Sequence, residues 1–185
     1  MSKSPSVILL HGSDEYAIAA HIEKLVTALG DPSTADMNIA RFDGRAGLNF
    51  ESLYTAVNAV PFLAPRRMVV LAHPSSAFPT GKAQKQIPAT DADAPPSEHR
   101  RRFLELLDNV PPTTSMLLVE SDTLKADHWL MKWARKSGAE MRACLMPKRW
   151  EMSKWLENEA RKQGGRMEPQ AASLLVEMTG EDTSI

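Results

Sequence analysis

The chain has 185 residues, of which 43% are hydrophobic and 24% charged, so it can bury a core and is not disordered by composition. Its 22 Lys and Arg residues nearly balance 23 Asp and Glu residues, and a net charge of −1 does not indicate a nucleic-acid or membrane surface. The single cysteine excludes an internal disulfide, and no apolar stretch reaches the roughly 18 residues of a transmembrane helix. The short polar start lacks the apolar region of a signal peptide, so we expect a cytoplasmic protein without a membrane partner.

The first segment predicts a strand, a glycine turn and a helix. Residues 7–10 are a continuous apolar run, which is typical of a strand buried on both faces of a parallel sheet. We expect Ser13 to be the N-cap of the helix, with Asp14 and Glu15 in its first turn, where the helix dipole favours acids. The helix carries a regular apolar stripe: Ile18, Ile22, Leu25, Val26 and Leu29.

The rest of the chain alternates between strands and helices as far as residue 146. Further apolar runs predict strands at 37–42, 68–71, 116–119 and 139–145. Helical patterns lie at 50–59, 98–107 and 127–137, and a proline-rich segment at 73–97 predicts a long loop. This alternation predicts a mostly parallel sheet with helices on both faces. Two helical patterns then follow with no strand between them, at 149–163 and 169–179, and predict a small helical module.

The turn after the first strand lies where α/β proteins usually bind phosphate, through backbone N–H groups and the helix dipole. A working phosphate loop reads G-x-x-x-x-G-K-[ST], and here only Gly12 fits that pattern. The following Ser13, Asp14 and Glu15 include two acids, which would repel phosphate. No acidic pair for magnesium follows the run at 68–71. We therefore expect a degenerate loop that binds no nucleotide, and no cofactor.

Five segments carry a further pattern through their order and spacing. They are Gly12–Tyr16 (a Gly-x-acid-x-aromatic turn), Phe42–Gly44, Ala59–Leu71, Leu117–Leu124 and Glu168–Gly180. Together they resemble the delta subunit of bacterial DNA polymerase III, a clamp-loader subunit. The resemblance covers nearly the whole chain, and its specificity comes from the order of the segments because each is weak alone.

The resemblance implies an AAA+-like, P-loop-type α/β domain over residues 1–146, with a five-stranded parallel sheet and a degenerate nucleotide site. Residues 147–185 would begin a small helical lid domain. The family pattern continues into a C-terminal collar domain that is absent here, so we expect a truncated chain that does not join a stable clamp-loader complex.

The function implied is that of a non-catalytic subunit of a DNA-directed DNA polymerase, a nucleotidyltransferase complex. Such a subunit binds and opens the ring-shaped sliding clamp (the beta subunit) and meets DNA through the assembled loader. The residues alone leave two alternatives open: a nucleotide-binding P-loop-type NTPase, and a nucleic-acid-binding adaptor.

The segment Val60-Pro61-Phe62-Leu63 is the main site candidate. The residues alone allow two interpretations: a loop whose Phe62 tucks into the core, or an exposed apolar plug that inserts into a partner's pocket. By resemblance, Phe62 and Leu63 fall where the family's clamp-binding pair lies. The resemblance therefore favours clamp binding through these four residues.

Two basic groups are candidates for contact with DNA or a partner. Arg100, Arg101 and Arg102 lie near a helix start and form either a solvated helix face or a weak phosphate contact. Arg66 and Arg67 lie at the entry to a strand, where they could touch the clamp or DNA.

The remaining chemistry-bearing residues favour structural roles. The five histidines lack metal-ligand spacing and there is no nucleophile-elbow motif, so we expect neither a metal site nor a catalytic residue. Cys144 is expected to be an inert core thiol. Trp129 and Trp133 share a helix face and should pack in the core, while Trp150 and Trp155 should pack the helical module together.

Overall fold

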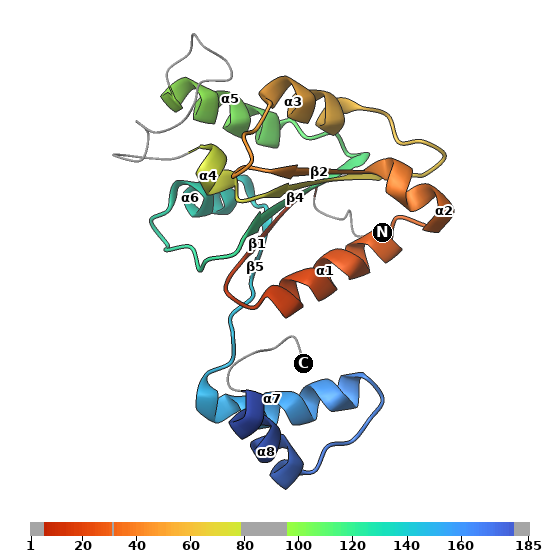
Figure 1. The fold of residues 1–185 in the computed structure, drawn as a ribbon. Helices are drawn as coiled ribbons and strands as arrows, with labels where there is room; N and C mark the ends of the chain where they lie inside the picture. The colour runs from red at the N-terminus through yellow and green to blue at the C-terminus, as the bar shows by residue number, and fades with distance from the viewer. Residues whose placement is uncertain (1–5, 31, 79–95, 180–185) are drawn as a thin grey trace.

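A computed structural model describes residues 6–30, 32–78 and 96–179 (Figure 1). Over these residues, five strands form one all-parallel sheet in the order β2-β3-β4-β1-β5. The strands are β1 (Val7–His11), β2 (Ile39–Asp43), β3 (Arg67–Ala72), β4 (Thr114–Glu120) and β5 (Glu140–Ala143). The predicted α/β class with a five-stranded parallel sheet is confirmed.

Helices fill the connections between the strands and follow the last one. They are α1 (Glu15–Thr27), α2 (Pro32–Ala35), the 3-10 turn η1 (Asp36–Asn38), α3 (Phe50–Asn58), α4 (Pro74–Ala77), α5 (Pro96–Asp108), α6 (Trp129–Ser137), α7 (Arg149–Lys162) and α8 (Pro169–Thr179).

The central strands are apolar because both of their faces are covered. Successive side chains point to opposite faces, so Leu9 and Leu118 pack beneath α3, α5 and α6, while Leu10 and Leu117 pack against α1. Figure 1 shows α1 on one side of the sheet and α3 and α5 on the other. The edge strands β2 and β5 are more exposed, which explains why their sequence signals are weaker.

Aromatic packing fixes the layer between α4, α5 and α6. Phe103 is fully buried; it stacks on Phe78 with ring centroids 4.3 Å apart and meets Trp129 edge-on at 6.3 Å. Full burial of such a ring contributes about 1.5–3 kcal/mol. Trp133 is also buried, and its Nε1 donates to the Asp108 carboxylate at 2.7 Å. Both tryptophans of α6 therefore pack in the core, as their four-residue spacing predicted.

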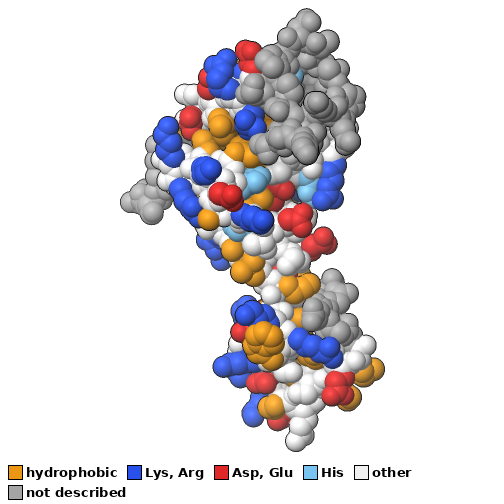
Figure 2. All heavy atoms as spheres, turned by 90° about the vertical axis from the view of Figure 1, so that its left-hand side faces the viewer, with side chains coloured by type: hydrophobic (Ala, Val, Ile, Leu, Met, Phe, Trp, Pro, Cys, Tyr) orange, Lys and Arg blue, Asp and Glu red, His pale blue; other side chains and the backbone are white. Residues whose placement is uncertain are grey.

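The helices α7 and α8 build a separate apolar cluster, centred on Met152, Leu156, Ala172 and Val176. In the space-filling view of Figure 2 this pair is joined to the α/β part by a narrow neck. Tyr16 connects the two parts, because its hydroxyl accepts from Gln163 Nε2 at 3.0 Å and its ring meets Trp155 edge-on.

One prediction for this module is wrong. Trp150 does not pack it: its residue is 75% exposed, and Lys148 Nζ lies 4.9 Å from the ring centroid. Trp150 precedes Met152 by two positions, which on a helix turns it away from the buried stripe of Met152 and Leu156. Trp155 does lie partly buried against that stripe.

Three local predictions also need correction. The N-cap of α1 is Asp14, not Ser13, because Asp14 Oδ1 accepts from the Ala17 N–H at 2.9 Å. The strand expected from residue 37 starts at Ile39, since the 3-10 turn η1 occupies the preceding residues. The segment at 73–97 is not all loop: α4 forms within it and α5 already begins at Pro96, while 79–95 lie outside the described residues.

The backbone at Cys144 approaches Gly12 so closely that a substitution of this glycine tests the fold. Gly12 has φ +142°, and an added Cβ would lie 1.9 Å from the Cys144 carbonyl oxygen; Gly30 has φ +120° but open space around it. We expect Gly30→Ala to cost about 1–3 kcal/mol through backbone strain alone. Gly12→Ala should cost clearly more in urea unfolding, because it adds a steric clash. Equal losses in the two variants would contradict this packing.

Candidate functional site

The segment between α3 and β3 exposes a cluster of apolar side chains. Val60 is 86% exposed, Phe62 53% and Leu63 80%, so Phe62 is not the core residue that one interpretation of the sequence allowed. Leu63 has φ +49°, a left-handed conformation that is uncommon for leucine. Large exposed apolar side chains on a short loop are typical of a protein-binding surface. We call Val60–Leu63 the apolar loop.

A buried side chain from another segment holds this loop. Asn38, in the 3-10 turn η1, is only 1% exposed. Its Oδ1 accepts from the Phe62 N–H at 2.7 Å, and its Nδ2 donates to the Phe62 carbonyl at 2.8 Å and to the Thr34 carbonyl at 3.0 Å. Sequence reasoning missed Asn38, because its two bonds to Phe62 join positions 24 residues apart.

Arg66 and Arg67 directly follow the apolar loop and lead into β3. The Nε and Nη2 atoms of Arg66 and the Nε of Arg67 are shielded from solvent, and none has a hydrogen-bond acceptor among the residues that the structure describes. Burial lowers the pKa of Arg67. Shielded guanidinium donors without acceptors are costly for the folded chain.

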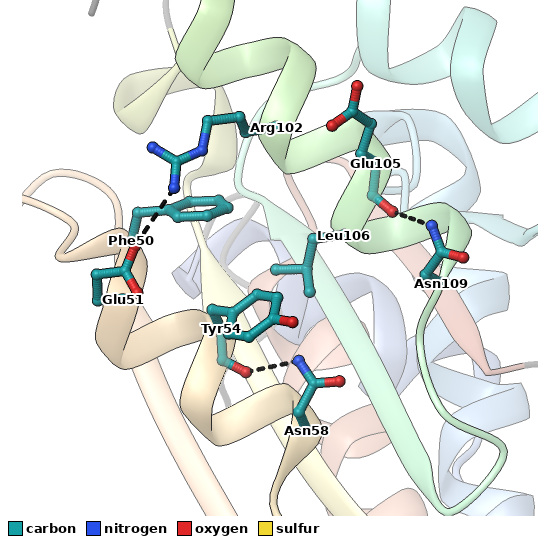
Figure 3. Close-up of a pocket in the computed structure, with 8 residues that line it drawn as sticks. All are labelled: Phe50, Glu51, Tyr54, Asn58, Arg102, Glu105, Leu106 and Asn109. Carbon is teal, nitrogen blue, oxygen red and sulfur yellow. Dashed lines mark hydrogen bonds and ion pairs between the residues drawn. The ribbon is translucent and has the colours of Figure 1, made fainter.

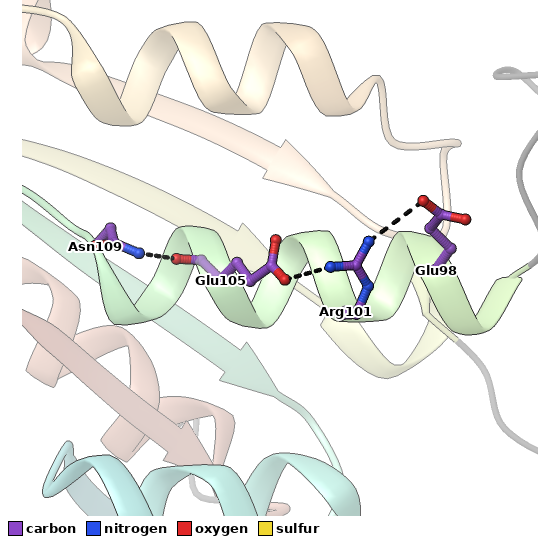
Figure 4. Close-up of polar contacts among 4 residues, drawn as sticks. All are labelled: Glu98, Arg101, Glu105 and Asn109. Carbon is purple, nitrogen blue, oxygen red and sulfur yellow. Dashed lines mark hydrogen bonds and ion pairs between the residues drawn. The ribbon is translucent and has the colours of Figure 1, made fainter.

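Arg100, Arg101 and Arg102 lie elsewhere, on α5, and each has a partner within the chain. Arg101 contacts Glu105 at 2.6 Å and Glu98 at 3.4 Å (Figure 4). Arg102 pairs with Glu51 at 3.3 Å and lies 4.9 Å from the Phe50 ring centroid, while Arg100 lies 6.0 Å from that of Trp129. These partners leave less of each guanidinium group for phosphate.

A pocket of about 370 Å³ lies between α3 and α5, beside Arg102 (Figure 3). It is lined by Phe50, Glu51, Tyr54, Asn58, Arg102, Glu105, Leu106 and Asn109. Glu51 pairs with Arg102, whereas the carboxylate of Glu105 pairs with Arg101 outside the pocket. The Asn58 amide donates to the Tyr54 carbonyl and the Asn109 amide to the Glu105 carbonyl, so most polar groups of the pocket already have partners within the chain.

The degenerate phosphate loop is closed by the chain itself. The Gly12 N–H donates to the Glu120 carbonyl and the Asp14 N–H to the Cys144 carbonyl, both at 3.1 Å. The carboxylate of Asp14 is buried and caps the first turn of α1, where a bound phosphate would otherwise accept. Ser13 and Glu15 are exposed beside it. Two of the loop's N–H groups and the helix end thus already have acceptors.

The two loops lie at opposite edges of the sheet. The phosphate loop follows the carboxyl end of β1, whereas the apolar loop precedes the amino end of β3, and β1 and β3 both run parallel to β4 between them. A small ligand at the phosphate loop would therefore lie away from the apolar loop.

A polar cluster that sequence reasoning missed lies where β4 ends. Glu120 Oε1 accepts from the Ser75 N–H at 2.6 Å, and Ser75 Oγ lies 3.3 Å from His128 Nε2. His128 Nδ1 accepts from the Leu130 N–H, so the neutral ring carries its proton on Nε2 and donates to Ser75. His128 is therefore arranged to cap α6 and not to activate Ser75 as a nucleophile.

Two features are absent from the described part of the chain. No three His, Cys, Asp or Glu side chains in it come close enough to hold a metal ion. None of its helices combines the length and the apolar character needed to cross a bilayer.

Comparison with known proteins gives the class and then the family. The fold matches the Bacillus subtilis DNA clamp loader delta protein with a TM-score of 0.70 at 21% identity, over 92% of this chain and 47% of that one. It also matches a DNA polymerase III gamma subunit-related protein from Thermotoga maritima, with a TM-score of 0.52 at 16% identity, over 94% of this chain and 54% of that one. The fold is thus the AAA+-like α/β fold of clamp-loader subunits.

Residues 9–143 match the family model of the DNA polymerase III delta subunit, and the chain belongs to that family. It spans about half the length of the solved structures that it matches. No curated protein sequence matches it significantly.

His11, which is buried, and His128, which is half-buried, are expected to make the stability of the fold depend on pH. Burial lowers the pKa of His11 and of His128 below the usual value of about 6.5, although Glu120 and Asp127 oppose the shift at His128. The unfolded chain then binds more protons than the native chain below about pH 6.5, so stability is lost as the pH falls. We expect a lower melting temperature at about pH 5.5 than at about pH 7.5.

His128→Asn is the matched variant, because asparagine can still cap α6 but does not titrate. The variant should lose part of this pH dependence. A wild-type chain that is equally stable, or more stable, at the lower pH would contradict the assignment.

Proposed function

We propose that this chain binds the sliding clamp through the apolar loop and stabilises the clamp's open form, without hydrolysing ATP itself. The observation that carries the proposal is the exposure of Phe62 and Leu63 in a member of the delta-subunit family. These two residues stand at the positions that the family resemblance gives to the clamp-binding pair.

Binding energy is the proposed source of work for such a role. Fully burying one Phe and one Leu side chain contributes about 3–6 kcal/mol gross. Phe62 is already about half buried and so supplies less than the full value for its ring. A contact that fits the open clamp better than the closed clamp shifts the clamp toward opening, by at most the difference between the two affinities.

The closed phosphate loop supports a role without nucleotide. A P-loop holds phosphate with unoccupied backbone N–H groups and a lysine. Here the N–H groups of Gly12 and Asp14 donate to backbone carbonyls, and the Asp14 carboxylate lies at the N-terminal end of α1. Binding of ATP would require these bonds to break and a buried carboxylate to face a polyphosphate.

The proposal assigns the clamp contact to residues 1–146 and a lid role to residues 147–185. The separate apolar cluster of α7 and α8 supports this division. Arg66 and Arg67 directly follow the apolar loop, and this position makes them candidates for a further contact with the clamp or DNA. Other clamp-loader subunits and DNA, met through the assembled loader in the cytoplasm, complete the proposed set of partners.

The direct test is the affinity for the sliding clamp of the same organism. We expect Phe62→Ala combined with Leu63→Ala to weaken binding by about tenfold or more, which corresponds to about 1.4 kcal/mol. Isothermal titration calorimetry with the purified 185-residue chain measures this loss.

A matched control is available on α8, where Leu174 is 57% exposed and far from the loop in sequence. Leu174→Ala should bind the clamp like the wild type. Wild-type affinity in the Phe62/Leu63 double variant would show that the contact lies elsewhere on the chain.

A further inference from the structure

We propose that Asn38 is a positioning residue for the clamp contact, and that Met37 beside it is a further contact residue. The inference rests on the proposed function, since it concerns the same surface. It adds a second segment of the chain, the 3-10 turn η1, to a contact that the family resemblance confines to the apolar loop.

The side-chain amide of Asn38 bonds both backbone groups of Phe62, as the backbone of a neighbouring strand would. Its oxygen accepts from the N–H of Phe62, and its nitrogen donates to the carbonyl of Phe62, at 2.7 and 2.8 Å. The second amide hydrogen goes to the Thr34 carbonyl at 3.0 Å, so both donors and the acceptor are engaged. Aspartate at this position would lose both donations, and an apolar residue would lose all three bonds.

These bonds fix the backbone from which the apolar side chains project. Leu63 is in the left-handed region at φ +49°, which costs free energy for a leucine and persists only where the surroundings hold it. Asn38 hydrogen-bonds Phe62, the residue immediately before Leu63, and Pro61 and Pro65 restrict the backbone on either side. The exposed Leu63 side chain thus stands on a fixed support, and a preorganised contact loses less conformational entropy on binding.

Met37 is an exposed apolar residue in this second segment. It is 66% exposed and directly precedes Asn38, which is bonded to Phe62. A methionine can adapt its unbranched side chain to an irregular wall, whereas the backbone of Phe62 is held by Asn38. The partner that this combination fits is a concave apolar pocket on the clamp, with Phe62 and Leu63 inserted and Met37 at the rim.

A double-mutant cycle on clamp affinity separates positioning from general structural support. We expect Asn38→Ala to weaken clamp binding by about fivefold or more, but by less than about twofold when Phe62 and Leu63 are already alanine. Asn38 then acts through those two side chains. Equal weakening in both backgrounds would mean that Asn38 only stabilises the fold, and would overturn the inference.

Hydrogen exchange and a second variant keep the test decisive if Asn38→Ala folds poorly. Asn38→Asp keeps the acceptor for the Phe62 N–H and loses both donations, so it should weaken binding to a smaller degree. In Asn38→Ala, exchange of the Phe62 amide should accelerate while the amides of β1 and β4 stay protected.

Two matched controls isolate the contacts. Thr114→Val removes another buried bond to the backbone, from Thr114 Oγ1 to the Val57 carbonyl at 2.8 Å, and should leave clamp affinity unchanged. Met37→Ala should weaken binding about threefold. Met178→Ala, at a residue 76% exposed on α8, should have no effect.

The outcomes distinguish this inference from the proposal beneath it. Wild-type binding by the Phe62/Leu63 double variant would overturn both. Weak binding by that variant, with wild-type binding by Asn38→Ala and Asn38→Asp, would overturn the positioning role alone. Equal affinities of the Met37 and Met178 variants would overturn the contact role of Met37.

Discussion

Parallel pairing of three fully covered strands is the constraint on which the rest of the structure depends. β1, β3 and β4 bury side chains on both faces, so their register is fixed and a slip by one residue would exchange the two faces. Because all strands run the same way, the loop after β1 and the loop before β3 must lie at opposite edges. The sheet thus places the turn at Gly12 and the exposed apolar loop at opposite edges.

This separation explains how a fold usually associated with nucleotide binding can serve a protein-binding role. At the carboxyl edge, the acceptors for the N–H groups of Gly12, Asp14 and Ala17 come from the chain itself. At the amino edge, backbone groups of the apolar loop are satisfied by Asn38 while its side chains are left to solvent. Free energy for the proposed function therefore comes from contact area and not from a bound phosphate.

Sequence patterns predicted the framework well because the framework depends on burial. The continuous apolar runs of β1, β3 and β4 and the stripe of α1 follow directly from two covered faces. Predictions were wrong where the outcome depended on which of several adjacent residues in the sequence takes a given position. Asp14 replaced Ser13 as N-cap because the helix starts one residue later, and Trp150 faces solvent because the buried stripe of α7 begins at Met152.

The candidate site was predictable only in part, and for a physical reason. Phe62 and Leu63 stand out because two large apolar residues between prolines are unusual, although the residues alone also allowed a core position. The sequence around Asn38 does not indicate its role, because its amide bonds a backbone segment 24 residues away that only the folded chain brings close. The cluster of Glu120, Ser75 and His128 was hidden for the same reason.

The central claim, that the apolar loop itself touches the sliding clamp, is tested most directly by a site-specific cross-link. Val60 is 86% exposed, and replacing it with a photoreactive residue leaves Phe62 and Leu63 intact. This variant of the chain is mixed with the clamp and irradiated. The same residue in place of Leu174 serves as the reference. A covalent adduct with the clamp from position 60 and none from position 174 is the predicted result. No adduct from position 60, or equal adducts from both positions, would contradict the account.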